Sequence, residues 1–163
     1  MNYLLLYSSK YGQTKKIIFQ ISKYLCNEGN ICDIMSININ KKINISYYKK
    51  VLIGASVLYG HLNPIVLKFT QNYYKELNAV ASGFFCVNLA ARKINKNTPK
   101  KNIYARKFLS KTKWKPNISD VFAGALYYSK YNFFDRTVIR FIMQLTGGET
   151  NVKKKLNILI GKK

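Results

Sequence analysis

The sequence predicts an α/β domain in which helices cover both faces of a doubly wound, five-stranded parallel sheet. Short apolar runs alternate along the chain with longer segments of helical periodicity, which is the pattern of such a sheet. The first run, Tyr3–Tyr7, is continuously apolar, as expected for a strand buried on both faces. No internal repeat or linker divides the 163 residues, so we expect a single domain spanning residues 1–163.

Each element of this fold has its own signal in the sequence. A first helix is expected from Thr14 to about Gly29, because apolar residues recur in it at helical spacing. A second helix should open at Asn63-Pro64, since proline suits the first turn of a helix. A third should carry Tyr104 and Phe108. The five expected strands are Tyr3–Tyr7, Ile31–Ile37, Val51–Ala55, Phe84–Val87 and Ser119–Ala125.

Residues 127–148 are expected to form an insertion after the fifth strand. The apolar residues of this segment recur at steps of three and four and form one helical stripe: Phe134, Val138, Phe141, Ile142 and Leu145. Arg136 and Arg140 lie on another face, and a basic amphipathic helix of this kind can lie in a lipid headgroup layer. The alternative is a helix packed on its own domain. After this insertion the chain is too short and polar for a full closing helix, so we expect a shortened C-terminus.

The charge of the chain is strongly unbalanced, with 28 Lys and Arg against 6 Asp and Glu, a formal charge of +22. Such a field favours anionic partners. The lysines are scattered, however, and Asn, Ile and Tyr are also abundant, so drift towards A/T-rich codons explains the charge better than nucleic-acid binding does. We therefore expect no nucleic-acid partner.

Cysteine and histidine content argue against disulfide and metal chemistry. Cys26, Cys32 and Cys86 form no C-x-x-C pair, which favours a reducing compartment. His61 is the single histidine, so no metal site is expected. No signal peptide and no apolar run of about 20 residues is visible, which predicts a cytosolic protein or one attached to a membrane from that side.

The turn after the first strand, Ser8 to Thr14, has the character of a phosphate site. Hydroxyls at Ser9 and Thr14 bracket Gly12, and the free N–H groups of the helix that follows favour an anion. The motifs for a pyrophosphate, G-x-G-x-x-G, and for a nucleoside triphosphate, G-K-[ST], are absent, which favours one terminal phosphate. An ordinary N-capped turn is the alternative interpretation.

Two further loops should meet the first at the carboxyl edge of the sheet, where ligands bind in open α/β folds. Gly54 to His61 follows the third strand, and Cys86 to Arg92 follows the fourth. Their small residues allow backbone amides to approach a flat ring, and Tyr59 can stack on it. The sequence thus predicts one loop for a phosphate and two for a planar ring.

The chain resembles the flavodoxin-like, menaquinone-dependent protoporphyrinogen IX dehydrogenase (oxidase) family of bacteria over about residues 1–150. The matching blocks are Tyr11-Gly12-Gln13-Thr14, Ile53-Gly54-Ala55-Ser56, Tyr59-Gly60-His61, Val87-Asn88-Leu89, Ala91-Arg92-Lys93, Thr98-Pro99, Tyr104-Ala105-Arg106-Lys107-Phe108-Leu109, Ala123-Gly124-Ala125-Leu126 and Gly147-Gly148-Glu149-Thr150.

The resemblance implies a flavodoxin-like fold and an oxidoreductase in haem biosynthesis. It would oxidise protoporphyrinogen IX with FMN (flavin mononucleotide) as cofactor and pass electrons to menaquinone or ubiquinone, as a peripheral protein on the cytoplasmic face of the inner membrane. The chemistry belongs to FMN. His61 is a weak candidate for proton transfer, and the alternative interpretation is a histidine that only hydrogen-bonds its own loop. The expected cofactor-binding residues are Ser9, Lys10, Tyr11, Gly12, Gln13, Thr14, Ser56, Tyr59, Gly60, Asn88, Leu89, Ala90, Ala91 and Arg92.

The resemblance also suggests anionic contacts and shows two departures. Arg92, Lys93, Lys96 and Arg106 are candidates to pair with the substrate's propionates. Leu58 and Tyr127 stand where the resemblance implies basic residues. These departures make a degenerate, weakly active member of the family one alternative, and a flavodoxin-type electron carrier is another.

Overall fold

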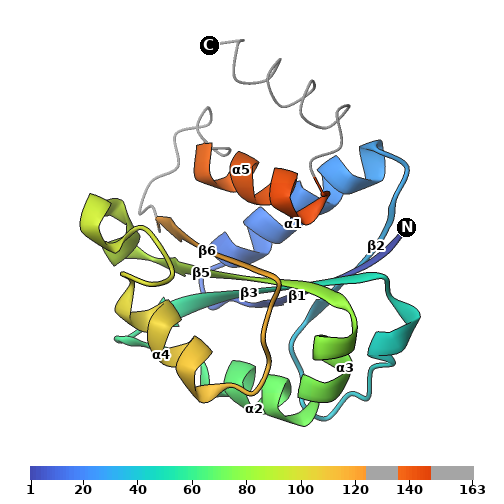
Figure 1. Cartoon of the computed structure of the whole chain (residues 1–163), viewed down its shortest axis with the longest axis horizontal. Coiled ribbons are helices and arrows are strands. Elements are labelled where there is room, and N and C mark those ends of the chain that lie inside the picture. Colours follow the sequence, from blue (N-terminus) through green and yellow to red (C-terminus); the bar gives the residue numbers. More distant parts are fainter. Residues whose placement is uncertain (124–135, 148–163) are drawn as a thin grey trace.

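A computed structural model describes residues 1–123 and 136–147 of the chain, and these residues form a three-layer α/β fold. The parallel part of the sheet has the strand order β2-β1-β3-β5-β6, so that the chain reverses direction across the sheet between β1 and β3. The expected doubly wound, five-stranded parallel sheet is confirmed. Figure 1 shows α1 and α5 on one face of the sheet and α2, α3 and α4 on the other.

The strands lie close to their expected positions. The bounds are β1 Asn2–Ser8, β2 Ile31–Ser36, β3 Lys50–Leu58, β4 His61–Leu62, β5 Ala81–Asn88 and β6 Ile118–Ala123. Strand β3 runs past its expected end at Ala55 because its last residues pair with β4 in an antiparallel hairpin. This two-residue strand β4 was not expected from the sequence.

The helices alternate with the strands. Their bounds are α1 Gln13–Asn27, α2 Pro64–Asn72, α3 Tyr74–Ala79, α4 Ile103–Lys111 and α5 Arg136–Leu145, with short 3-10 turns at Ile45–Tyr47, Leu89–Arg92 and Ile94–Lys96. Asn63 begins α2 as its N-cap, since its side chain accepts a hydrogen bond from Ile65 N–H. Within residues 1–123 and 136–147, no helix is long and apolar enough to cross a bilayer.

Each face of the sheet has its own hydrophobic core. On the face of α2 and α4, Phe84 stacks on Phe108 at 4.6 Å between ring centroids, and the buried Trp114 contacts Phe84 edge-on. On the face of α1 and α5, Phe85 stacks on Phe122 at 4.8 Å. Because adjacent residues of a strand point to opposite faces, Phe84 and Phe85 supply one ring to each core.

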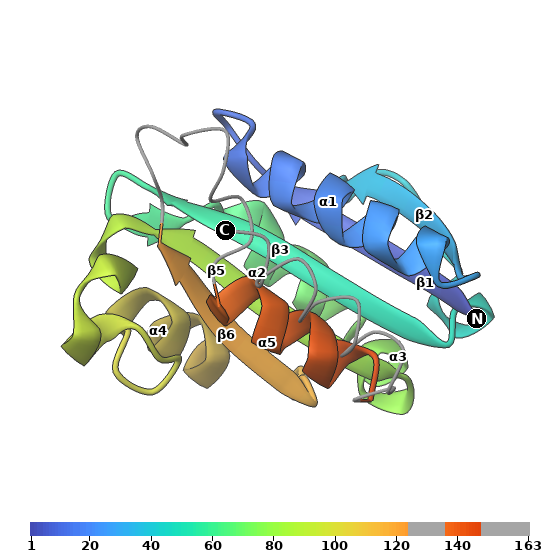
Figure 2. The same cartoon turned by 90° about the horizontal axis from the view of Figure 1, so that it is seen from above.

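Helix α5 packs on its own domain. Phe141, Ile142 and Leu145 are buried against the sheet beside α1, and the Phe141 ring meets Phe122 at 5.6 Å. Figure 2 shows α5 lying along β6, on the same side of the sheet as α1. These three members of the apolar stripe therefore do not face lipid, because they fill the core. The structure does not describe the insertion before Arg136, which includes Phe134, or the residues from Gly148 onwards. Nor does it describe the side chains of Arg136, Val138 and Arg140.

Candidate functional site

The turn between β1 and α1 forms a cradle of N–H groups. Gly12 adopts a left-handed conformation with φ +86°, which glycine tolerates, and its N–H donates to Ser9 Oγ at 3.0 Å. The first helical hydrogen bond runs from Lys16 N–H to Gly12 O at 2.9 Å. The amides of residues 13–15 thus precede the hydrogen-bonded part of α1, where an anion is favoured by free donors and by the helix dipole.

Two buried polar atoms at this turn have no partner in the described part of the chain. Thr14 is fully buried. Neither Thr14 Oγ1 nor Gln13 Nε2 makes a hydrogen bond with a described residue. A buried polar group without a partner costs about 1–3 kcal/mol, which a ligand that supplies the hydrogen bond would recover. A phosphate monoester offers acceptor oxygens for both groups, so the residues present fit the phosphate of FMN.

The β3–β4 hairpin brings a second loop to the first. Tyr59 and Gly60 form its two-residue turn with φ +51° and +82°, the signs of a type I′ turn. Tyr59 is 79% exposed and Tyr11 is 77% exposed. Lys10 lies between them, with its Nζ 5.6 Å from the Tyr59 ring centroid and 6.0 Å from that of Tyr11. Two exposed aromatic rings therefore flank the phosphate cradle and offer stacking surfaces to a planar ligand.

The loop after β5 is held by a pair of buried amides. Asn88 Oδ1 accepts hydrogen bonds from Ala91 N–H at 3.0 Å and from Asn102 Nδ2 at 2.9 Å. Asn102 in turn begins α4, because its Oδ1 accepts from the N–H groups of Tyr104 and Ala105. Its Nδ2 also donates to Lys96 O at 2.9 Å. The two side chains thus fix both ends of the segment from Asn88 to the start of α4.

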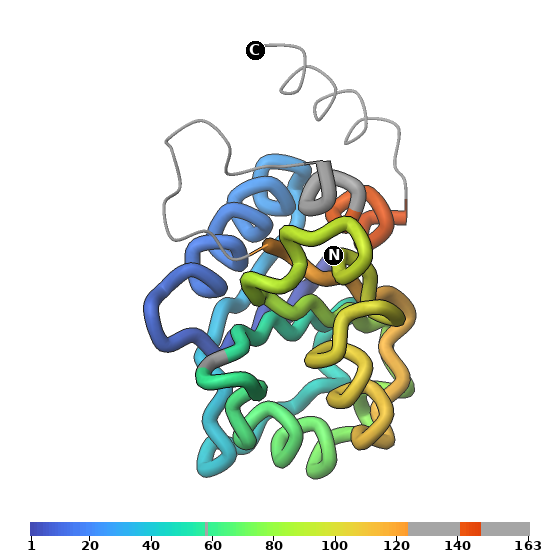
Figure 3. Tube along the Cα trace, turned by 90° about the vertical axis from the view of Figure 1, so that its left-hand side faces the viewer, coloured from blue at the N-terminus to red at the C-terminus, as the bar shows by residue number. Residues whose placement is uncertain are grey.

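Sheet register places these three loops at one edge. Ser8 pairs with Ala55, and Ser56 pairs with Val87, so the carboxyl ends of β1, β3 and β5 are neighbours. Figure 3 looks onto this edge, with the loop before α1 in blue, the β3–β4 turn in blue-green and the segment after β5 in yellow-green. This is the edge where open α/β sheets bind their ligands.

The expected cofactor residues differ in what their side chains offer. Ser56 Oγ donates to Ser8 O at 3.4 Å, across the two strands rather than outward. The side chain of Asn88 is occupied by Ala91 and Asn102, and Ala91 is buried. Leu89 and Arg92 are exposed, and Ala90 is half-buried. Leu89, Ala90 and Arg92 therefore offer exposed atoms to a ligand, whereas Asn88 supports this segment from behind.

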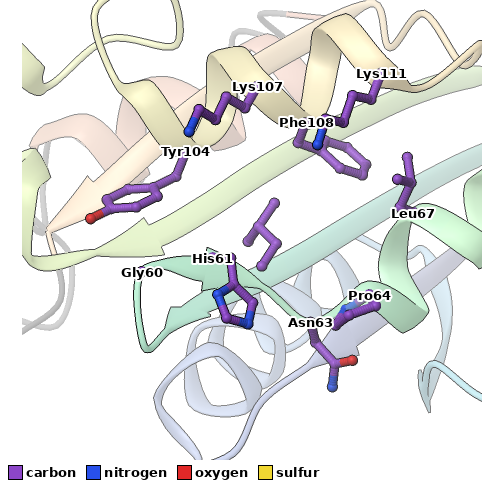
Figure 4. A pocket seen from close by; sticks show the side chains of 10 residues that line it. Gly60, His61, Asn63, Pro64, Leu67, Tyr104, Lys107, Phe108 and Lys111 are labelled. Carbon is purple, nitrogen blue, oxygen red and sulfur yellow. The ribbon is translucent and has the colours of Figure 1, made fainter.

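A cavity of 310 Å³ opens beside the hairpin and was not expected from the sequence. It lies between β4, the start of α2 and one side of α4, as Figure 4 shows. The lining residues are Gly60, His61, Leu62, Asn63, Pro64, Leu67, Tyr104, Lys107, Phe108 and Lys111. The ring of His61 makes no hydrogen bond with any described residue, so its nitrogens face a ligand or solvent.

No cysteine is placed as a nucleophile at this edge. Burial raises the pKa of the Cys86 thiol to about 12, although the hydrogen bond from Asn88 acts in the opposite direction. A thiol with such a pKa stays protonated at neutral pH and is a poor nucleophile. Cys86 therefore supplies no nucleophile to the site.

Comparison with known proteins agrees with this geometry. Residues 4–153 match the model of the "Flavodoxin domain" family. A protoporphyrinogen IX dehydrogenase [quinone] from Leishmania major is 46% identical over 154 residues, 94% of this chain and 67% of the relative. One from Escherichia coli strain K12 is 38% identical over 156 residues, 96% of this chain and 86% of the relative.

A solved structure confirms the fold independently. A flavodoxin from Pseudomonas aeruginosa matches 90% of this chain and 100% of its own, with a TM-score of 0.62 and 11% sequence identity. At that identity the likeness concerns the fold alone.

Proposed function

Because this chain belongs to the flavodoxin domain family and, within it, to the quinone-dependent protoporphyrinogen IX dehydrogenases, we propose that it oxidises protoporphyrinogen IX to protoporphyrin IX with FMN as cofactor and a quinone as electron acceptor. Each pair of hydrogens removed from the porphyrinogen reduces one quinone to a quinol. The product is the last metal-free tetrapyrrole before haem, so the reaction belongs to porphyrin and haem biosynthesis.

The observation that carries the cofactor assignment is the unpartnered hydroxyl of Thr14 at the start of α1. A fully buried hydroxyl without an acceptor is rare in folded proteins. It lies where the amides of residues 13–15 and the helix dipole favour an anion. Ser9 Oγ accepts the hydrogen bond from Gly12 N–H, and its own hydroxyl hydrogen remains a further donor for the phosphate. The FMN phosphate is the ligand that satisfies this set.

The flavin ring would lie along the same edge. Tyr59 and Tyr11 offer stacking surfaces, and residues 89–92 would border the ring from the neighbouring strand. Lys10, between the two tyrosines, places a positive charge beside both the phosphate and the ring. When bound, FMN accepts hydride equivalents from the porphyrinogen and passes electrons to the quinone.

His61 is the side chain best placed to move a proton. It follows the hairpin turn directly and lines the cavity beside it. A neutral imidazole can take a proton from a ring nitrogen or a bridging carbon of the substrate. The other interpretation, in which His61 only hydrogen-bonds its own loop, lacks a hydrogen bond within the described residues.

We further propose that the protein acts at the cytoplasmic face of the inner membrane, as a peripheral protein, with menaquinone or ubiquinone as acceptor. Quinones of respiratory membranes are lipid-soluble, so their reduction requires access to the bilayer. The charge of +22 supports this location, because anionic lipid headgroups attract basic proteins. The buried residues of α5 offer no support for it, since they pack against the sheet.

An anaerobic turnover assay tests the proposed function. The purified protein is loaded with FMN, mixed with protoporphyrinogen IX and a water-soluble quinone, and followed by porphyrin fluorescence. We expect porphyrin to form above the background rate only when FMN, quinone and protein are all present. A flavin-loaded protein that gives no porphyrin above the background would contradict the enzyme assignment.

The same preparation separates the alternatives. A flavodoxin-type electron carrier would accept electrons from a reductase but give no porphyrin. A weakly active family member would give porphyrin at a rate proportional to protein concentration, but its kcat at saturating porphyrinogen would be low. Heat-denatured protein and free FMN serve as controls, because free flavin also oxidises porphyrinogens slowly.

A further inference from the structure

The cavity beside the hairpin combines an apolar wall with two positive charges. Pro64, Leu67 and Phe108 supply apolar surface from α2 and α4. Lys107 and Lys111 are four residues apart, so they lie on the same side of α4 and border the same space. Figure 4 shows both lysines on the side of α4 that faces the cavity, across from His61 and Pro64. Among the residues lining it there is no carboxylate to neutralise them.

This composition selects an amphipathic anion. An apolar ligand would leave the two exposed ammonium groups with water as their sole partner, and a small inorganic anion would leave the apolar wall uncovered. A ligand that presents a hydrocarbon framework with two carboxylates at one edge satisfies both parts. A porphyrinogen that carries two propionates on adjacent pyrroles has this form.

The position of the cavity connects it to the flavin edge. Gly60 and His61 belong both to the β3–β4 hairpin and to the cavity wall. Next to Gly60, the ring centroid of Tyr59 lies 5.6 Å from the Nζ of Lys10, which belongs to the phosphate loop. A ligand anchored between α2 and α4 therefore extends past His61 towards the place where the flavin ring would lie.

The volume indicates partial enclosure of such a ligand. At 310 Å³ the cavity is at the small end of the range of about 300–1,000 Å³ for ligand pockets. A cavity of this size can enclose the carboxylate-bearing edge of a tetrapyrrole but not the whole macrocycle. The remainder of the ring would then project towards the hairpin.

The basic residues suggested by the sequence lie elsewhere. Arg92, Lys93, Lys96 and Arg106 are exposed, and none of them lines the cavity. Arg106 is adjacent to Lys107 in α4, but successive residues of a helix point in different directions. It is therefore a natural control for the two cavity lysines.

We propose that Lys107 and Lys111 bind the propionates of protoporphyrinogen IX in the cavity between β4, α2 and α4, and thereby orient the macrocycle towards the flavin. This inference rests on the proposed function for the identity of the substrate. The two lysines would act in substrate binding, with no part in holding FMN.

A charge-removal series on the FMN-loaded full-length protein tests this proposal. The double variant K107Q/K111Q is compared with K68Q/R106Q, which removes two exposed positive charges from the same two helices outside the cavity. We expect K107Q/K111Q to raise the KM for protoporphyrinogen IX about 5- to 10-fold with little change in kcat, as two partly exposed ion pairs are lost. The flavin content at 450 nm should stay at the wild-type level.

A substrate analogue completes the cycle. Protoporphyrinogen IX dimethyl ester lacks the negative charges, so the wild type should bind it more weakly than the acid. K107Q/K111Q should no longer distinguish the two compounds. An equal preference for the acid in K107Q/K111Q and in the wild type would overturn the proposal, as would an equal rise in KM for both double variants.

A binding measurement separates this proposal from the proposed function. Protoporphyrin IX, the dicarboxylate product, is titrated into each FMN-loaded protein and followed by its fluorescence, without turnover. Weaker binding in K107Q/K111Q alone would support the cavity assignment even if no porphyrinogen is oxidised. Identical binding by the wild type and both variants would refute it, whatever the activity.

Discussion

The loops that follow β1 and β5 lie at the same edge of the sheet but treat their polar groups in opposite ways. After β1, Thr14 Oγ1 and Gln13 Nε2 are buried without partners among the described residues. After β5, the side chains of Asn88 and Asn102 satisfy each other and the backbone around them. The loop after β1 therefore has buried polar groups that a ligand could hydrogen-bond. In the loop after β5, the buried amide side chains are already hydrogen-bonded in the flavin-free protein.

This difference assigns the two loops different roles in binding. The first loop would gain hydrogen bonds from the phosphate and so supply affinity, at a cost to the stability of the flavin-free protein. The second loop is already ordered, so it loses little conformational entropy when the ring arrives. Substitutions in the two loops should consequently have effects of opposite sign on the flavin-free protein.

The largest effect is expected for Asn102→Ala. The substitution removes the N-cap of α4 and the partner of Asn88, and leaves Lys96 O without its donor. We expect the free energy of unfolding of the flavin-free protein to fall by about 3 kcal/mol, measured by urea denaturation with Trp114 fluorescence. Asn63→Ala, which removes an exposed N-cap with one hydrogen bond, is the control and should cost about 1 kcal/mol. Equal losses for the two variants would mean that the buried amide pair adds nothing.

Thr14→Val should act in the opposite direction. Valine keeps the shape of threonine but removes the unpartnered hydroxyl, so the flavin-free protein should gain about 1 kcal/mol. The dissociation constant for FMN should rise about 10- to 100-fold, because a hydrogen bond to a charged phosphate is lost. Flavin fluorescence quenching measures the affinity and urea denaturation the stability. If the variant binds FMN as tightly as the wild type, the phosphate does not bind at Thr14.

Tyr59→Asn should separate strain from stacking in the hairpin. Tyr59 has φ +51°, a conformation that asparagine adopts more readily, so the flavin-free protein should gain about 0.5–1 kcal/mol. Loss of the ring should weaken FMN binding by a few-fold, corresponding to about 1 kcal/mol of stacking. Tyr11→Asn removes a similar exposed ring without relieving a positive φ and should leave stability unchanged. A drop in stability for Tyr59→Asn would show that the tyrosine ring, and not the turn, governs the hairpin.

The smallest effect concerns Cys86. The rate at which its thiol is alkylated measures how often the loop after β5 opens to solvent. Its pKa is raised to about 12 by burial, so the thiolate fraction stays small until the pH approaches that value. Iodoacetamide at pH 8 should modify the exposed Cys26 and leave Cys86 unmodified until the protein is unfolded, as mass spectrometry of peptides would show. Modification of Cys86 in the folded protein at the rate of Cys26 would mean that the loop opens readily.

The sequence predicted the sheet because its strands are apolar runs with few alternatives. Tyr3–Tyr7 is buried on both faces, and local pattern and tertiary environment therefore agree. The position of the turn before α1 was also predictable, since Gly12 and the start of α1 are adjacent in sequence. The hairpin strand β4 was missed because a pair of two residues, His61 and Leu62, is too short to give a period.

The cavity and the amide pair could not be predicted in the same way. Both depend on residues that are distant in sequence, such as Asn88 and Asn102, or Leu67 and Lys111. Partial signals were present, since asparagine before a helical run marks an N-cap, and Lys107 and Lys111 recur at helical spacing. Which face of α5 would be buried depended likewise on its neighbours in space, and the basic amphipathic pattern suited two environments equally.

The hydrogen bonds between Asn88 and Asn102 have a consequence for how the two ligands influence each other. Asn88 holds residues that border the flavin edge, whereas Asn102 begins the helix that carries Lys107 and Lys111. A shift of one asparagine is passed to the other, because each side-chain amide both donates a hydrogen bond to the other and accepts one from it. Thermodynamic linkage then makes the effect reciprocal. If bound FMN raises the affinity for a tetrapyrrole by some factor, the bound tetrapyrrole raises the affinity for FMN by the same factor.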